Sequence, residues 1–213
     1  MSASDLVQLF SKKVYPITDV RLSGLSHAEQ VERLSYGGAT LIQLRDKHSS
    51  PREFYKEAEK ALQVARERGV RIVINDRVDI ALALKADGVH LGQDDLPPEA
   101  ARLVLGDQAI IGFSTHNIEQ AREAARMPLD YVAFGPIFRT SSKSNAHSSV
   151  GLEGLRRVRE AVGKTPLVAI GGIHSANAPG VLATGADAIA VISELLSRPA
   201  EIASQTRRLL SFC

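Results

Sequence analysis

Eight short runs of apolar, β-favouring residues recur along this 213-residue chain, and their repetition constrains the fold more than any other feature. They lie at residues 14–20, 39–46, 71–76, 88–92, 109–115, 131–138, 166–172 and 188–193. Stretches with apolar residues at helical spacing separate them, including 51–68, 116–127, 151–162 and 199–210. Nearly continuous apolar strands alternating with helices indicate a parallel sheet covered by helices. At about 27 residues per unit, the chain predicts an α/β fold, a single-domain (β/α)8 TIM barrel over residues 1–213.

The even-numbered runs share a weak internal repeat. Small or acidic residues lead into the second, fourth, sixth and eighth runs, in GGATLIQL, KADGVHLG, PLDYVAFG and TGADAIAVI. We therefore expect Asp87, Asp130 and Asp187 to be turn residues at the N-terminal end of the barrel, where they serve stability. The polar stretch at 139–149 follows the sixth run, and its length and position predict a mobile flap.

Composition excludes several classes of partner. The net charge is only +2, aromatic residues are 5% of the chain and Trp is absent, which argues against a nucleic-acid surface. No run approaches the ~18 apolar residues of a membrane helix, and the first residues do not resemble a secretory signal. The single cysteine, Cys213, cannot form an internal disulfide. We expect a soluble cytoplasmic protein that binds neither nucleic acid nor membrane.

Acidic residues follow the third and fourth runs, at the C-terminal end of the expected barrel. Asp76 ends the third run and Asp95 follows the fourth. Adjacent strands lie ~4.8 Å apart, so two such carboxylates can approach one cation, as in sites for Mg²⁺. Alternatively, Asn75 or Asp76 and Asp94 or Asp95 cap the helices that follow. Recurrence on consecutive strands of a barrel favours the metal.

Cationic residues lie at the end of the second run. A two-residue period places Gln43, Arg45 and Lys47 on one face, and Lys143 lies in the expected flap. Together with Mg²⁺, these cations could hold a diphosphate as it leaves a substrate. The alternative for Lys143 is an ordinary solvated lysine in a polar loop.

The seventh and eighth runs end in a pattern typical of phosphate sites. Gly171–Gly172 end the seventh run, and Ile192–Ser193 end the eighth. Backbone N–H groups after these strands commonly bind phosphate, and glycine permits a close approach. A tight turn that requires glycine is the alternative.

The fifth run ends in Ser114-Thr115-His116-Asn117. Ser114 could reach inward to a ligand, and His116 could act as an acid or base. Equally, Thr115 or Asn117 could cap the next helix. No Ser-His-Asp order, zinc-ligand spacing or Walker motif is visible.

These motifs, in this order, resemble the thiamine phosphate synthase family over nearly the whole chain. The matching stretches are LIQLRDK (41–47), INDRVDIALALKADGVHLGQDDLP (74–97), IGFSTHN (111–117), DYVAFGPIFRTSSK (130–143), GLEGL (151–155), VAIGGI (168–173) and GADAIAVIS (185–193). The family fold is a TIM barrel. The resemblance implies a transferase that joins a hydroxymethyl-aminopyrimidine diphosphate to a phosphorylated thiazole, with a pyrimidine carbocation captured after the diphosphate leaves.

The resemblance also implies roles for individual residues. The pyrimidine diphosphate would contact Gln43, Arg45, Lys47, Asn75, Ser114 and Lys143, of which Arg45, Lys47, Ser114 and Lys143 would be catalytic. Asp76 and Asp95 would bind Mg²⁺ as the cofactor. The thiazole phosphate would contact Thr140, Ser142, Gly172, Ile192 and Ser193. The partners would be these small molecules, and a homo-oligomer is left open.

Two positions depart from the family pattern. Arg139 stands where proline is usual, and its charge has no assigned role. Ser142 stands where threonine is common, and it keeps the hydroxyl.

Two other functions compete with the synthase. A thiazole tautomerase of the same superfamily would use His116 as its acid–base catalyst. A non-catalytic ligand-binding barrel would not need both metal carboxylates and the flap lysine. The set of Gln43, Arg45 and Lys47, with the polar loop of Thr140, Ser142 and Lys143, favours the synthase.

Overall fold

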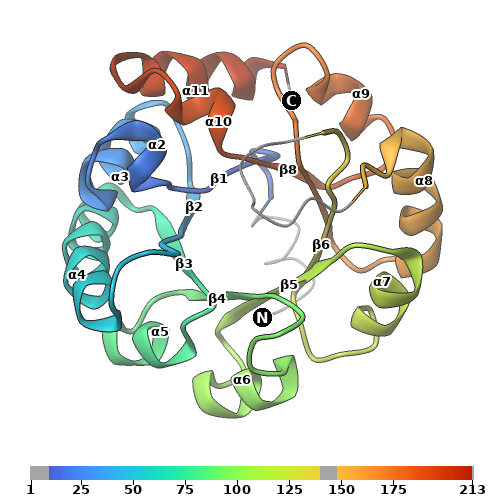
Figure 1. Cartoon of the computed structure of the whole chain (residues 1–213), viewed down its shortest axis with the longest axis horizontal. Helices are drawn as coiled ribbons and strands as arrows, with labels where there is room; N and C mark the ends of the chain where they lie inside the picture. The colour runs from blue at the N-terminus through green and yellow to red at the C-terminus, as the bar shows by residue number, and fades with distance from the viewer. Residues whose placement is uncertain (1–9, 140–147, 213) are drawn as a thin grey trace.

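A computed structural model describes residues 10–139 and 148–212. Eight parallel strands form one sheet in the order β1-β8-β7-β6-β5-β4-β3-β2. They are β1 (Val14–Pro16), β2 (Leu41–Leu44), β3 (Arg71–Asn75), β4 (Gly88–Leu91), β5 (Ile110–Thr115), β6 (Tyr131–Phe134), β7 (Leu167–Ile170) and β8 (Ala188–Val191). A bridge between Ile17 and Gln43 joins β1 to β2, where the Thr18 N–H donates to the Gln43 carbonyl at 2.9 Å. The ring of strands inside a ring of helices (Figure 1) confirms the predicted TIM barrel.

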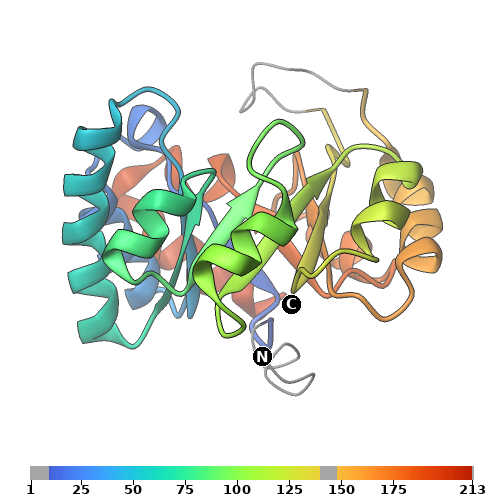
Figure 2. The ribbon, with the colours of Figure 1, turned by 90° about the horizontal axis from the view of Figure 1, so that it is seen from below.

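The helices lie on the outside of the strands. They are α2 (Val20–Ser23), α3 (His27–Tyr36), α4 (Pro51–Arg68), α5 (Val78–Leu84), α6 (Pro98–Leu105), α7 (Ile118–Ala124), α8 (Gly151–Val162), α9 (Ala178–Leu182), α10 (Ser193–Leu196) and α11 (Ile202–Ser211), with a 3-10 turn η1 (Pro199–Glu201) before α11. Figure 2 views the barrel from the side, with α4 and α8 on opposite flanks. Every strand residue except Arg71 and Ile170 is buried, as expected for a parallel sheet covered by helices.

Local signals explain where the helices begin and end. Ser50 and Glu53 form a reciprocal capping box at the start of α4, and Gly69 ends this helix in the left-handed conformation. The predicted helices 51–68 and 151–162 are confirmed at both ends. The predicted helix 116–127 shortens at both ends to α7, and its start is set by the Asn117 side chain, which accepts from the Gln120 N–H. The predicted helix 199–210 divides into η1 and α11.

All eight strands are shorter than the predicted runs, and the first and the sixth lose the most residues at their C-terminal ends. The first ends at Pro16 rather than at residue 20, because the Asp19 side chain caps α2 by accepting from the Leu22 N–H. The sixth ends at Phe134 rather than at residue 138, where Gly135 and Pro136 follow it. In both cases the β-favouring residues continue past the point where the chain leaves the sheet, so composition overestimates the strand.

The N-terminal end of the barrel carries the repeat of aspartates. Each carboxylate accepts a hydrogen bond from a backbone N–H near the start of the preceding strand. The pairs are Asp87 with Ile72, Asp130 with Ile111 and Asp187 with Leu167, at 2.7, 2.7 and 2.8 Å. In each pair the aspartate N–H also donates to the same partner's carbonyl. The aspartates therefore join β4, β6 and β8 to β3, β5 and β7 at the end where they were expected.

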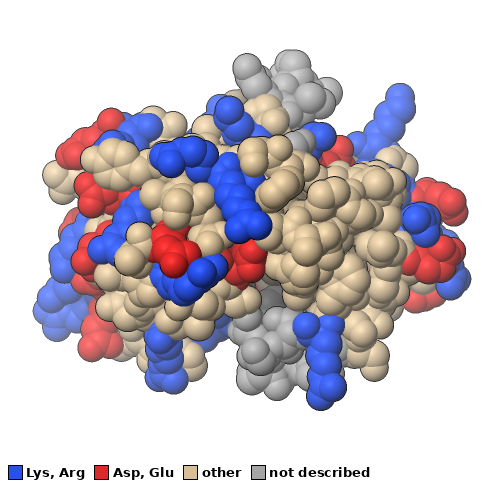
Figure 3. Space-filling model, turned by 90° about the horizontal axis from the view of Figure 1, so that it is seen from above, with Lys and Arg blue, Asp and Glu red and all other residues tan. Residues whose placement is uncertain are grey.

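On the face in Figure 3, both Lys and Arg and Asp and Glu side chains are present. This mixture agrees with the small net charge of +2. Across residues 10–139 and 148–212, no helix is long and apolar enough to cross a membrane.

Candidate active site

The acidic residues after β3 and β4 do not cap the next helices, so that alternative is wrong. The N-cap position of α5 is Arg77 and that of α6 is Pro97, and neither helix has a side-chain cap. Asp76 instead adopts a left-handed backbone with φ of 64°. Such a conformation is uncommon for any residue with a side chain, and it is found disproportionately at functional sites.

The carboxyl groups of Asp76 and Asp95 lie close enough to influence each other. Partial burial raises the pKa of Asp95 above its ordinary value, and an N–H from Gly92 offsets part of that rise. The Asp76 carboxylate then adds to the rise. Gly92 donates to Asp95 at 2.6 Å, and the Lys47 ammonium donates to Asp76. Two neighbouring carboxylates and one lysine thus meet at the C-terminal ends of β2, β3 and β4.

Asn75 lies at the end of β3, directly before Asp76. Its side chain is buried, and among the described residues its Nδ2 atom has no hydrogen-bond partner. Buried amide groups are nearly always hydrogen-bonded in folded proteins. An unpaired amide donor beside a pair of carboxylates is therefore ready to bind an oxygen atom of a ligand.

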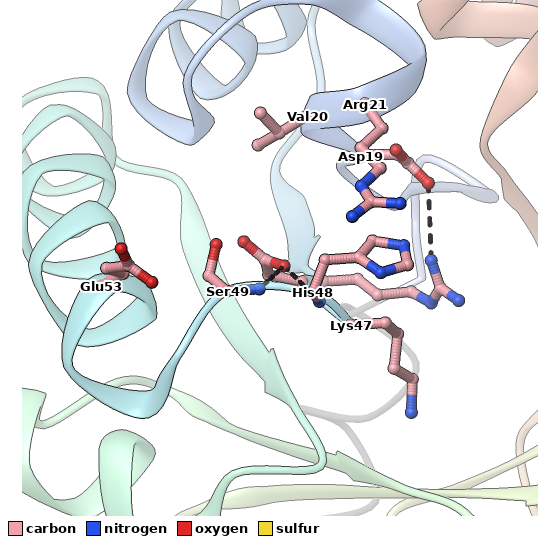
Figure 4. Close-up of a pocket in the computed structure, with 9 residues that line it drawn as sticks. Asp19, Val20, Arg21, Lys47, His48, Ser49 and Glu53 are labelled. Atoms are coloured by element: carbon pink, nitrogen blue, oxygen red, sulfur yellow. Dashed lines mark hydrogen bonds and ion pairs between the residues drawn. The ribbon is translucent and has the colours of Figure 1, made fainter.

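The residues of the second run do not share one environment. Gln43 is buried inside the barrel, where its Nε2 donates to the Tyr15 hydroxyl at 3.1 Å. Arg45 and Lys47 follow β2 at the mouth, and Arg45 forms an ion pair with Asp19 at 3.5 Å. The cations line a pocket of about 320 Å³ (Figure 4), whose lining residues are Asp19, Val20, Arg21, Arg45, Asp46, Lys47, His48, Ser49 and Glu53.

Sequence reasoning missed the residues that support this cationic loop. The Thr18 hydroxyl lies 2.7 Å from His27 Nδ1 and accepts from the Arg45 N–H at 3.1 Å. Burial lowers the pKa of His27 below its ordinary value, although the nearby Asp46 carboxylate opposes this shift. Burial raises the pKa of Asp46, but hydrogen bonds from Ser49 and His48 outweigh it and lower the pKa overall. A polar residue in α3 gives no sequence signal for this role, because it acts through tertiary contact.

The end of β5 presents Ser114 to the barrel interior. Ser114 is buried, its Oγ lies 2.8 Å from His90 Nε2, and its carbonyl accepts from Gln93 Nε2 at 2.6 Å. His116 is oriented differently, with Nδ1 lying 2.8 Å from the Gly135 carbonyl. Since a carbonyl only accepts, His116 donates from Nδ1 and fixes the turn after β6. His90 was not singled out by sequence, although a polar residue in the apolar run GVHLG is a usable signal.

Both backbone conformation and steric crowding require glycine at the two positions after β7. Gly171 and Gly172 have φ of 104° and 63°. A Cβ on Gly172 would lie 2.7 Å from the Arg139 carbonyl oxygen and 2.8 Å from Phe138 Cβ. The requirement for glycine in a tight turn is therefore real, and it brings the loops after β6 and β7 together. Ile192 and Ser193 lie at the start of α10, also at the mouth.

Three of the expected site residues lie outside the described residues: Thr140, Ser142 and Lys143, together with most of the flap predicted at 139–149. Arg139 is described and exposed, and nothing in the structure assigns its charge a role.

The described residues include no cluster of three or more His, Cys, Asp or Glu side chains arranged for a metal ion. A cation at the mouth would have two protein carboxylates, those of Asp76 and Asp95. This number suits Mg²⁺, which usually takes one or two carboxylates and completes its shell with water and substrate phosphates. The unpaired Asn75 amide and the raised pKa of Asp95 fit a site that binds a cation and an oxyanion together.

Comparisons with known proteins agree over most of the chain. The profile of the family "Thiamine monophosphate synthase" matches residues 14–195. Thiamine-phosphate synthase of Clostridium novyi is 49% identical over 185 residues, which cover 86% of this chain and 90% of that protein. The corresponding protein of Chloroflexus aurantiacus is 46% identical over 186 residues, which cover 87% of this chain and 85% of that protein.

Solved structures give the same result. Thiamine phosphate pyrophosphorylase from Pyrococcus furiosus superposes with a TM-score of 0.85 at 41% identity and covers 96% of each chain. An aldolase from Zymomonas mobilis superposes with a TM-score of 0.74 at 17% identity, over 100% of this chain and 98% of that one. The second similarity shows the barrel fold alone.

Proposed function

Since this chain belongs to the thiamine monophosphate synthase family, we propose that it is a transferase that makes thiamine phosphate. Its substrates are a 4-amino-2-methylpyrimidine carrying a methylene diphosphate and a thiazole carrying a phosphoethyl group. The new bond joins the pyrimidine methylene to the thiazole nitrogen, and diphosphate leaves. The observation that supports this reaction best is the neighbouring pair Asp76 and Asp95, with Lys47 and the unpaired amide of Asn75 beside it.

The reaction that fits these residues is dissociative. The carbon–oxygen bond to diphosphate breaks first, and the thiazole nitrogen captures the resulting carbocation. This order places the greatest demand on neutralising the leaving diphosphate, which Arg45, Lys47 and Lys143 would do with the Asn75 amide. Asp76 and Asp95 would bind Mg²⁺, which supplies further positive charge to the diphosphate. Closure of the mouth would exclude water from the carbocation.

The remaining residues divide between the two substrates. Gln43 and Ser114 would bind the pyrimidine ring inside the barrel, where both side chains are buried. Gly172, Ile192 and Ser193 would bind the thiazole phosphate together with Thr140 and Ser142. The glycines after β7 and the start of α10 support this, because both lie at the mouth.

The proposed reaction has a direct test. The purified protein is mixed with both substrates and Mg²⁺, and thiamine phosphate and diphosphate are measured together. Formation of both products in equal amounts, and its loss when a chelator is added, is the expected result. Failure to form thiamine phosphate at any Mg²⁺ concentration would contradict the proposal. That the protein forms a homo-oligomer and that it is located in the cytoplasm both remain predictions from the sequence.

A further inference from the structure

A continuous chain of hydrogen bonds crosses the interior of the barrel below the mouth. It joins five buried side chains from five different strands: Gln43, Tyr15, Tyr131, His90 and Ser114. Gln43 Nε2 lies 3.1 Å from the Tyr15 hydroxyl, which lies 3.0 Å from the Tyr131 hydroxyl. His90 continues the chain, with Nδ1 2.9 Å from the Tyr131 hydroxyl and Nε2 2.8 Å from Ser114 Oγ. The two ends, Gln43 and Ser114, are the residues proposed to bind the pyrimidine.

A glycine on β5 makes the link between His90 and Tyr131 possible. His90 on β4 pairs in register with Gly112, and Gly112 pairs in register with Tyr131 on β6. A Cβ on Gly112 would lie 2.0 Å from Tyr131 Cζ. Because Gly112 has no side chain, the Tyr131 ring reaches across β5 and stacks on His90, with ring centroids 5.5 Å apart and an angle of 20° between the planes. The stacked phenol holds the imidazole in one orientation.

The donors and acceptors along the chain can be assigned one consistent direction, starting from the Gln43 amide. The Gln43 amide donates to Tyr15, because an amide N–H cannot accept. Burial raises the pKa of Tyr15 and of Tyr131 above the ordinary tyrosine value, so both hydroxyls keep their protons. Among the described residues, Tyr15 then donates to Tyr131, and Tyr131 donates to His90 Nδ1. With this assignment His90 carries its proton on Nε2, and this N–H donates to Ser114 Oγ.

This direction determines what Ser114 offers to a ligand. Since Ser114 Oγ accepts from His90, its own proton is available for an acceptor atom at the mouth. An aminopyrimidine ring has such acceptors, its ring nitrogens. We propose that His90 is a positioning residue for the pyrimidine substrate, which makes Ser114 a hydrogen-bond donor to a ring nitrogen. This inference rests on the proposed synthase function and adds a residue to which the sequence assigned no role.

The test compares two replacements of His90 that differ in one property. His90→Gln keeps an N–H that can donate to Ser114, whereas His90→Met fills similar space without a donor. Initial rates are measured for both variants, for Ser114→Ala and for the double variant His90→Met with Ser114→Ala, varying each substrate in turn. Thermal unfolding of each variant shows whether it is folded.

The expected result is selective for one substrate. His90→Met raises the KM for the pyrimidine diphosphate about tenfold, which is the size of one net hydrogen bond, and leaves the KM for the thiazole phosphate within about twofold. His90→Gln stays within about threefold of the unaltered protein. The double variant is no worse than Ser114→Ala alone, because His90 acts through Ser114.

Three results would overturn the inference: an unchanged KM in His90→Met, equal losses in the Gln and Met variants, or losses that multiply in the double variant. If His90→Met does not fold, Tyr131→Phe replaces it, since this change keeps the ring and removes the hydroxyl bonded to Nδ1. A KM for the pyrimidine diphosphate raised about threefold supports the inference, and an unchanged KM opposes it. Absence of thiamine phosphate formation by the unaltered protein would instead contradict the proposed function.

Discussion

The two ends of this barrel use the same residue type for opposite purposes. At the N-terminal end, Asp130 accepts from the Ile111 N–H at 2.7 Å and from Arg102 at 2.8 Å. Asp187 has the same arrangement, with Arg159 at 2.9 Å. At the C-terminal end, Asp76 and Asp95 face each other, and the pKa of Asp95 is raised by burial and by its neighbour.

The difference shows which carboxylates have their hydrogen-bond donors within the protein and which are suited to a ligand. The carboxylates at the N-terminal end have their donors within the protein, so they stabilise the fold. Among the described residues, the pair at the C-terminal end accepts from Lys47 and the Gly92 N–H and lies next to the unpaired Asn75 amide, an arrangement that would suit a cation and an oxyanion. Mutations at the two ends should therefore separate stability from activity.

The largest effect is expected at Asp76. Asp76→Asn removes the charge and suits the left-handed backbone, which asparagine tolerates better than alanine. We expect kcat to fall by about 10²- to 10³-fold, as when one charge-stabilising group is removed, with unchanged folding. Product formation at saturating substrates and Mg²⁺ measures this. Turnover close to that of the unaltered protein would remove the distinction between the two ends.

The next effect is on stability, at the other end. Asp130→Ala removes the carboxylate that accepts hydrogen bonds from Arg102 and from the Ile111 N–H. We expect this loss to lower the free energy of unfolding by about 2–4 kcal/mol. The kcat should remain within about twofold, because the mutation lies at the opposite end of the strands. Urea unfolding and initial rates measure the two quantities. Loss of activity in the folded variant would show that the ends are coupled.

A smaller effect of opposite sign is expected at Asp95. Without metal at pH 7, Asp95→Asn should stabilise the fold by a few tenths of a kcal/mol, since the partly exposed like-charge pair is screened by solvent. The raised pKa means that protonated Asp95 contributes stability below its ordinary value of 3.8, and this contribution is lost as the pH rises through the raised value. The gain should therefore disappear below about pH 4. A destabilised variant in unfolding scans from pH 3 to 8 would argue against repulsion.

The smallest effect on activity is expected at His116, and it tests the alternative function of a thiazole tautomerase. His116→Ala removes the hydrogen bond to the Gly135 carbonyl, and synthase turnover should stay within about tenfold. Asn117→Ala is a matched control, because it removes the cap of α7 without touching the imidazole. A loss of several thousandfold in His116→Ala alone would identify the histidine as an essential acid or base.

The sequence predicts the barrel well because the information is local. Each strand and each long helix has its own periodicity, and the helix 51–68 carries its capping box and final glycine within 20 residues. The aspartate pair was also predictable, since carboxyl ends of neighbouring parallel strands meet at one end of a barrel.

Contacts across the barrel were not predictable from local pattern. The stacking of His90 on Tyr131 depends on the missing side chain of Gly112 on the strand between them. The support of the Arg45 loop depends on His27 from α3 meeting Thr18 after β1. A periodic pattern shows that a residue faces inward, but it does not show which inward-facing residues touch.

The most direct measurement of the central claim is the shift in melting temperature caused by Mg²⁺ with inorganic diphosphate. Binding to the folded state alone should raise the melting temperature of the unaltered protein by several degrees at saturation. Asp130→Ala should show the same rise from a lower starting temperature, whereas Asp76→Asn and Asp95→Asn should show almost none. An equal rise in all four proteins would contradict the assignment of the cation to the carboxylates at the C-terminal end.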